Sequence, residues 1–223
     1  MQRRDDHRDA RAIFDKGVAR LHHRNVTAID GASNAGALVA TAARVGAFAL
    51  PIGSLDAVIS TTLPPGAYTA HVRGAGAARG VGLVEIYDAA AGIGNSRITN
   101  LSARGAVGTG DSILIAGFVI RGAQPKSVLI RAVGPTLAAF GVTDALADPR
   151  LQVFSGSSLV ESNDNWTDAS AANAALQSGA FSLATGSKDA AIVVVLQPGA
   201  YTAQVSGSAG ATGVALVEVY ELP

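Results

Sequence analysis

One segment of this chain occurs twice. Residues 46–87 and 179–220 align without a gap, and 25 of the 42 positions are identical. A repeat of this kind indicates a protein assembled from copies of one unit. We therefore expect a modular architecture rather than a chain organised around a single catalytic centre.

The repeated segment has the pattern of antiparallel β-strands. In the first copy, apolar and polar residues alternate over residues 68–73, as they do in a half-buried strand. A Pro-Pro-Gly turn precedes this stretch, and a Gly-rich loop joins it to a second apolar stretch at 81–87. Together with the many glycines and small side chains, this pattern predicts an all-β protein, an antiparallel β-sandwich of the jelly-roll kind.

The two copies are not equally complete. Residues 95–223 include two further apolar stretches, at 112–121 and 126–133, and a polar, then Ala-rich connection at 163–175. We predict a complete β-sandwich module at 95–223, and a partial β-module with a joint at 25–94. A charged N-terminal segment, residues 1–24, precedes them.

The N-terminal segment combines high charge with a helical spacing of apolar residues. Residues 1–24 carry seven Arg or Lys, four Asp and three His. The apolar residues recur at spacings that place them on one helical face: Ala10, Ile13, Phe14, Val18 and Leu21. We predict a short amphipathic helix here, with a solvated leader as the alternative.

A partial module raises a physical problem, because half a sandwich exposes strand edges and one apolar face. Three arrangements would cover them. The partial module could pack on the complete one, residues 1–45 could supply the missing strands, or a neighbouring molecule could donate strands by β-augmentation. The third arrangement would produce a head-to-tail polymer.

Composition limits the chemistry of the complete module. The chain has no cysteine, and its four histidines all lie before residue 89. Zinc sites and Ser–His–Asp or Cys–His arrangements are therefore excluded from residues 89–223. The formal net charge of zero gives no electrostatic footprint for nucleic acid.

The sequence also limits the relation of the chain to membranes. No run of apolar residues is long enough to predict a transmembrane helix. Residues 1–16 lack the apolar core of a secretory signal. If the protein acts outside the cell, we expect its export signal to lie elsewhere or outside this chain.

One loop holds the best cluster of oxygen-bearing side chains. Asn163, Asp164 and Asn165, with Asp168 nearby, form a candidate calcium site. Calcium takes about six to eight oxygen ligands from carboxylates, amides and carbonyls. Two carboxylates are few for this ion, so a network of Asx turns is the alternative. We predict no catalytic residues and no other cofactor.

Trp166, the only tryptophan, is a candidate ligand-binding residue. An exposed Trp beside Asn and Asp would suit stacking on a sugar, whereas a Trp that fills the core is the alternative.

Two carboxylates recur in both copies, as Asp56 and Asp189 and as Glu85 and Glu218. One member of each pair in each copy suits a structural role that is repeated per module. Glu85 is a candidate partner for the backbone or for an arginine such as Arg131.

Several stretches resemble a tandem repeat module of large secreted or surface proteins of environmental bacteria, namely residues 96–122, 127–142, 161–166 and 196–221. The last stretch, with its PGAYT and LVEVY motifs, is also similar to bacterial pre-peptidase C-terminal domains, which are jelly-roll β-sandwiches. The first resemblance covers residues 95–223 well and residues 46–88 in part. It implies an exported, non-catalytic protein with a structural or adhesive role, located outside the cell or on its surface.

We therefore expect a protein that is not an enzyme. The favoured function is an extracellular structural or adhesive module that self-assembles into a filament or matrix by strand complementation, with further copies of itself as partners. The alternative is a carbohydrate- or surface-binding accessory module of a secreted protein. Its partner would be a polysaccharide, and its site would be Trp166 with the loop at 163–168.

Overall fold

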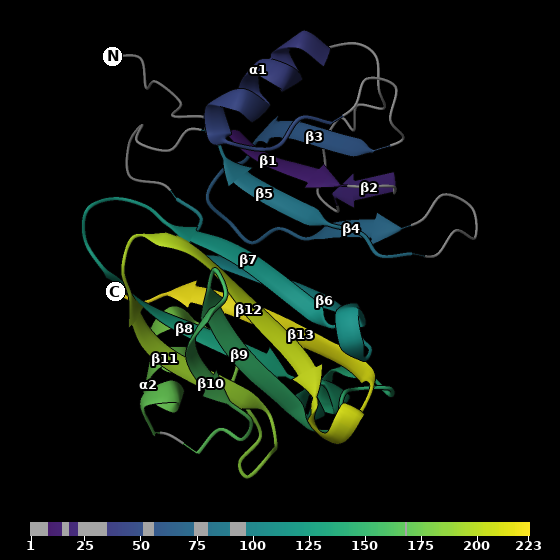
Figure 1. Ribbon diagram of the computed structural model, residues 1–223, viewed down its shortest axis with the longest axis vertical. Helices are drawn as coiled ribbons and strands as arrows, with labels where there is room; N and C mark the ends of the chain where they lie inside the picture. Colours follow the sequence, from purple (N-terminus) through teal and green to yellow (C-terminus); the bar gives the residue numbers. More distant parts are fainter. Residues whose placement is uncertain are drawn as a thin grey trace. The chain divides into compact units, whose positions relative to one another are not determined.

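The computed structural model describes residues 9–14, 18–21, 35–50, 56–73, 80–89, 97–167 and 169–223. The chain divides into two compact units, Met1–Ile98 (unit 1) and Thr99–Pro223 (unit 2). This division lies close to the joint expected before residue 95. Antiparallel strands dominate both units, which confirms the predicted all-β class (Figure 1).

Unit 2 contains two four-stranded antiparallel sheets, with strand orders β10-β9-β12-β7 and β11-β8-β13-β6. Its strands are β6 (Asn100–Val107), β7 (Leu114–Ile120), β8 (Lys126–Val133), β9 (Pro149–Ser155), β10 (Ser158–Asn163), β11 (Ala190–Leu196), β12 (Gly199–Gly207) and β13 (Gly213–Glu221). The connections include helix α2 (Ala169–Ser178) and short 3-10 helices at Gly110–Ser112, Pro135–Phe140 and Ser208–Gly210.

The main core of unit 2 lies between these two sheets. Strand β8 contributes Val128, Ile130 and Ala132, which pack against buried residues of β9, β12 and β13. The alternate residues Leu129 and Val133 lie in a second apolar cluster on the opposite face of the same sheet. Strand β8 is therefore buried on both faces, which explains its nearly continuous apolar sequence.

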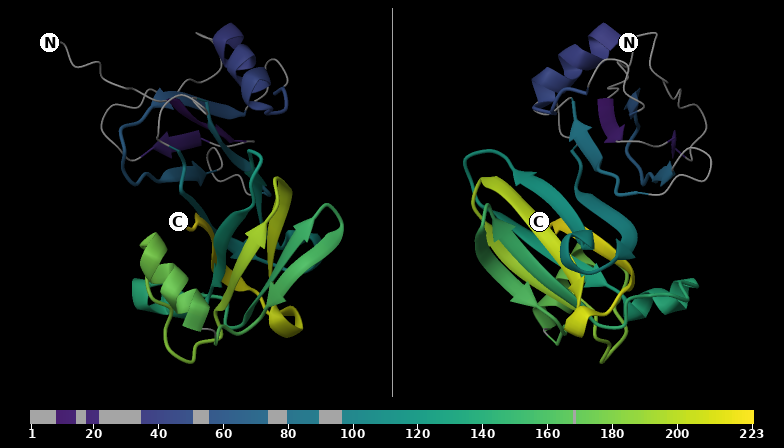
Figure 2. Two further views of the ribbon diagram at one scale, coloured as in Figure 1. Left: turned by 90° about the vertical axis from the view of Figure 1, so that its left-hand side faces the viewer. Right: turned by 45° about the vertical axis from the view of Figure 1, so that its right-hand side comes forward.

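Helix α2 packs on the outer face of the sheet that contains β8 (Figure 2). Its buried residues Ala171, Ala174 and Ala175 belong to the second apolar cluster. Residues 163–175 were predicted to be a polar, then Ala-rich connection, but its Ala-rich part belongs to helix α2. Alanine has the highest helix propensity, and its small side chain lets the helix approach the sheet closely.

Unit 1 contains a three-stranded antiparallel sheet of order β3-β1-β5 and a two-stranded ribbon, β2-β4. Its elements are β1 (Asp9–Phe14), β2 (Val18–Leu21), α1 (Ala35–Val45), β3 (Ala57–Thr62), β4 (Ala70–Arg73) and β5 (Val84–Asp88). In the alignment of the two copies, β3, β4 and β5 correspond to β11, β12 and β13 and are their first copies.

Strand β1 takes the place in unit 1 that β8 takes in unit 2. Strand β8 lies between β11 and β13, and β1 lies between their first copies, β3 and β5. Ile13 pairs with Glu85 on β5, just as Arg131 pairs with Glu218 on β13. The pairing of β1 with β3 has the same register as that of β8 with β11. The N-terminal segment thus supplies a missing strand within the chain, the second of the three arrangements considered above.

The predicted N-terminal helix is wrong for the described residues between 9 and 21, which form strands β1 and β2. In β1, Ala10, Ala12 and Phe14 also fit a period of two, although Ile13 does not. Strands β3 and β5 offer hydrogen-bonding edges on both sides of β1, and this tertiary context overrides the local helical pattern.

The duplication extends upstream of the segment that is visible in sequence. Helices α1 and α2 end at equivalent positions, immediately before the two copies begin, and a glycine with positive φ follows each helix, Gly46 (φ 79°) and Gly179 (φ 72°). The next amide in each unit donates to the carbonyl five residues before it, at 3.0 and 2.9 Å. The same left-handed cap therefore ends both helices.

Among the described helices, none has the length and hydropathy needed to cross a lipid bilayer.

Candidate functional site

A buried ion pair joins the two central strands of the second sheet of unit 2. Arg131 on β8 is 1% exposed and lies directly opposite Glu218 on β13. Its Nε donates to Glu218 Oε2 over 2.8 Å, and its Nη2 donates to the same oxygen. Nη1 donates to the carbonyl of Phe181 at 2.5 Å, and the guanidinium lies 4.4 Å from the centroid of the Phe181 ring. The charge is thus paired, hydrogen-bonded and covered.

Tyr220 completes this group of side chains. Its hydroxyl donates to Glu218 Oε1 at 2.7 Å, so both carboxylate oxygens of Glu218 accept hydrogen bonds. Burial raises the pKa of Tyr220 to about 12, and the hydrogen bond to Glu218 adds to the shift. The phenol therefore stays protonated well above the pH at which an exposed tyrosine ionises.

A second buried carboxylate, Asp189, fixes the loop that follows β8. Asp189 is fully buried and precedes β11. Its Oδ1 accepts from the backbone amides of Gly134 at 2.7 Å and Thr136 at 3.3 Å. Its Oδ2 accepts from the hydroxyls of Thr136 and Ser187, the latter at 2.5 Å. These four donors explain how an aspartate is tolerated in an apolar interior.

Trp166 belongs to the same network. Its indole Nε1 donates to Ser187 Oγ at 3.1 Å, and its backbone amide donates to the Asp189 carbonyl at 2.8 Å. The ring is half-buried and packs against the second apolar cluster. This geometry suits the core-filling alternative better than an exposed sugar-stacking platform.

The candidate calcium loop is partly held by its own hydrogen bonds. Asn163 Oδ1 accepts from the amide of Ala191 at 3.1 Å, and its Nδ2 donates to the Asn165 carbonyl at 3.3 Å. Asp164 and Asn165 are exposed, and Asp168 lies outside the described residues. Within the described ranges, no group of three or more His, Cys, Asp or Glu side chains converges as a metal site. Calcium binding here stays a prediction.

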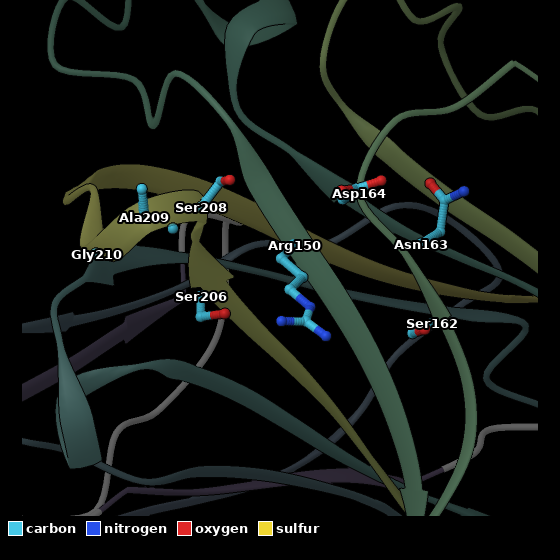
Figure 3. Close-up of a pocket in the computed structure, with 9 residues that line it drawn as sticks. Arg150, Ser162, Asn163, Asp164, Ser206, Ser208, Ala209 and Gly210 are labelled. Atoms are coloured by element: carbon cyan, nitrogen blue, oxygen red, sulfur yellow. The ribbon is translucent and has the colours of Figure 1, made fainter.

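An open polar hollow of about 630 Å³ lies beside this loop. Figure 3 shows Arg150 on β9, with Ser162, Asn163 and Asp164 on one side and Ser206 on the other. Backbone and small side chains of the 3-10 helix at Ser208–Gly210 complete the lining. Sequence reasoning points only to the Asn163 and Asp164 part of this hollow, because β9 and β12 come together only in the folded sheet.

In unit 1, the counterpart of the ion pair is incomplete. The Tyr87 hydroxyl donates to Glu85 Oε1 at 3.0 Å, as Tyr220 does to Glu218. Glu85 Oε2 is buried and has no hydrogen-bond partner among the side chains that the structure describes. Arg131, a candidate partner for Glu85 from sequence, instead pairs with the repeat partner of Glu85, Glu218. In unit 1, Ile13 occupies the register position that corresponds to Arg131.

Of the recurring carboxylates, Asp189 and Glu218 in unit 2 join neighbouring strands and loops, which fits the structural role expected for them. Both oxygens of Asp189 and both of Glu218 accept hydrogen bonds. What sequence reasoning missed was the set of partners, Thr136, Ser187 and Phe181. The available signal was the recurrence itself, because a carboxylate repeated within apolar strands predicts a satisfied buried group.

No protein-family model and no curated protein matches the chain. Among solved structures, the chain is similar to the pre-peptidase C-terminal domain of a collagenase from Bacillus anthracis, with 14% identity and a TM-score of 0.34. The match covers 54% of this chain and 89% of that chain. This is the class of domain that the C-terminal strands resemble in sequence, but a similarity this weak defines neither a family nor a function.

Proposed function

We propose that the chain is a non-catalytic structural or adhesive module of the extracellular space or cell surface, and that it associates with further copies of itself through strand edges. One observation carries the proposal. Strand β13 is flanked by β8 and β6, whereas its first copy, β5, lies at the end of the β3-β1-β5 sheet among the described strands.

The apolar residues of β5 reflect this difference. Val84 is 44% exposed, whereas its repeat partner Val217 is 1% exposed. Ile86 and, just before the strand, Val81 are exposed as well. An edge strand with uncovered apolar residues is a template for pairing with another chain. The sequence resemblance of residues 95–223 to modules of secreted proteins supports the extracellular setting.

Sedimentation velocity at two protein concentrations tests self-association. We expect a concentration-dependent species larger than the monomer for the wild type. A lysine on the β5 edge, Ile86→Lys, should weaken it by about tenfold or more, because an edge lysine blocks strand pairing. Leu176→Lys, on the exposed face of helix α2 and away from any strand edge, is the matched control and should leave it unchanged. A strictly monomeric wild type at both concentrations contradicts the proposal.

The polar hollow beside β9 supports a second candidate function, the binding of a polysaccharide. Arg150 and Asp164 line it, and such groups hydrogen-bond sugar hydroxyls. A glycan array with the wild type and Arg150→Ala tests this function. We expect a signal that Arg150→Ala abolishes, and the absence of any signal for the wild type contradicts it.

A further inference from the structure

Strands β1 and β8 occupy equivalent positions but have unlike sequences. Residues 9–14 of β1 correspond in order to residues 127–132 of β8, because the registers with both neighbouring strands match. Over these positions, no residue is identical between the two strands. The first copies of β11 and β13 therefore receive a central strand that is not a copy of β8.

The residue types of β1 suit a central position less well than those of β8. Strand β8 places Val128, Leu129 and Ile130 at positions that are at most 2% exposed. At the same register positions, β1 has Ala10, Arg11 and Ala12. A strand with larger apolar residues at these positions would remove more apolar surface from water.

Glu85 adds an electrostatic requirement to this position. Its repeat partner Glu218 receives two guanidinium hydrogen bonds from Arg131, while Glu85 is paired in register with Ile13. Glu85 Oε2 has no hydrogen-bond partner among the described side chains. A buried carboxylate oxygen without a donor is unfavourable, and a guanidinium is the group that the second copy uses to satisfy it.

We propose that β1 is a replaceable strand, and that unit 1 accepts in its place an extended segment of a partner chain with the chemistry of β8. That segment has large apolar residues at the positions of Val128, Leu129 and Ile130, and an arginine opposite Glu85. The inference goes beyond the proposed function, because it concerns the central strand position of unit 1 and not the outer edge of β5. It therefore stands or falls separately from self-association.

A synthetic peptide with the sequence of residues 126–133, labelled with fluorescein, is the probe. Its binding to the full chain is measured by fluorescence anisotropy, with hydrogen exchange to locate the bound site. We expect saturable binding accompanied by faster exchange of the amides of β1. A peptide with leucine in place of its arginine should bind about tenfold or more weakly, since a charge-assisted pair is lost. This comparison needs no change in the protein.

Two protein variants act as controls. Glu85→Gln should remove most of the difference between the two peptides. Ala12→Cys together with Ile86→Cys should, once oxidised, lock β1 in place and abolish binding, and reduction should restore it. Absence of binding to the unlocked wild type overturns the proposal. So does binding that is indifferent to the peptide's arginine, or binding that persists in the oxidised variant.

Discussion

Ile13 occupies in unit 1 the register position that Arg131 occupies in unit 2, opposite the same repeated glutamate. The two units therefore share one strand arrangement and differ in the chemistry at its centre. In unit 2 the glutamate is joined to an arginine, and in unit 1 it keeps only its tyrosine among the described side chains. On our proposal, this difference leaves unit 1 able to accept a strand from a partner chain.

The Arg131–Glu218 pair predicts a large loss of stability when one partner is removed. Arg131→Leu should lower the free energy of unfolding of unit 2 by about 3–5 kcal/mol, because it leaves a buried charge unpaired. Urea unfolding followed by Trp166 fluorescence measures it, since the only tryptophan lies in unit 2. The double variant Arg131→Leu with Glu218→Leu should lose less than the single one. A single variant with wild-type stability contradicts the account.

We expect unit 2 to lose more stability when Asp189 is replaced than when its hydroxyl partner Thr136 is replaced. Asp189→Ala leaves four donors without their acceptor and should cost about 3 kcal/mol or more, whereas Thr136→Ala should cost about 1–2 kcal/mol. The same urea titration measures the loss of stability in both variants. Asp56→Ala, the change at the repeat partner in unit 1, serves as control and should leave the Trp166 transition in place. Equal effects of Asp189→Ala and Asp56→Ala on that transition would show that Asp189 is not the anchor described.

The raised pKa of Tyr220 predicts that the protein loses stability at high pH. Its pKa is raised to about 12 by burial and by the hydrogen bond to Glu218, against about 10 in an unfolded chain. Between these values the unfolded state releases the proton while the folded state keeps it, so the free energy of unfolding falls as pH rises from about 10 to 12. Below about pH 10 the contribution is fully present. Urea midpoints across this range should fall less steeply for Tyr220→Phe, and identical slopes would contradict the assignment.

The loop at 163–165 offers a test that separates structure from metal binding. Because Asn163 Oδ1 accepts from the Ala191 amide, Asn163→Ala should destabilise unit 2 by about 1 kcal/mol in EGTA as well as in calcium. Melting temperatures in both buffers check this expectation. A loss that occurs only when calcium is present would instead identify the loop as a calcium site, because an ion that binds the folded state raises its stability by mass action.

Much of the fold could be predicted from sequence because period-2 alternation and turn residues are local signals. The apolar stretches at 112–121 and 126–133 were expected within the complete β-module, and strands β7 and β8 lie there. The role of β1 could not be predicted, because it depends on two strands that lie far along the chain, β3 and β5, and its own residues also fit a helix. Only the carboxylates of the buried hydrogen-bond network could be predicted from sequence, and their partners could not. Asp189 and Glu218 recur in sequence, but Arg131 and Thr136 become their partners only through the pairing of β8 with its neighbours.

The most direct test of the central claim is a disulfide across the β1–β5 pairing. The chain has no cysteine, so Ala12→Cys with Ile86→Cys, which are directly paired residues, gives an unambiguous readout. Oxidised at low protein concentration and analysed by intact mass and peptide mapping, this variant should form the disulfide within one chain. Ala12→Cys with Tyr87→Cys, shifted by one residue to the other face, should not. An absent bond, or one that links two chains, would contradict the placement of β1 in the position of β8.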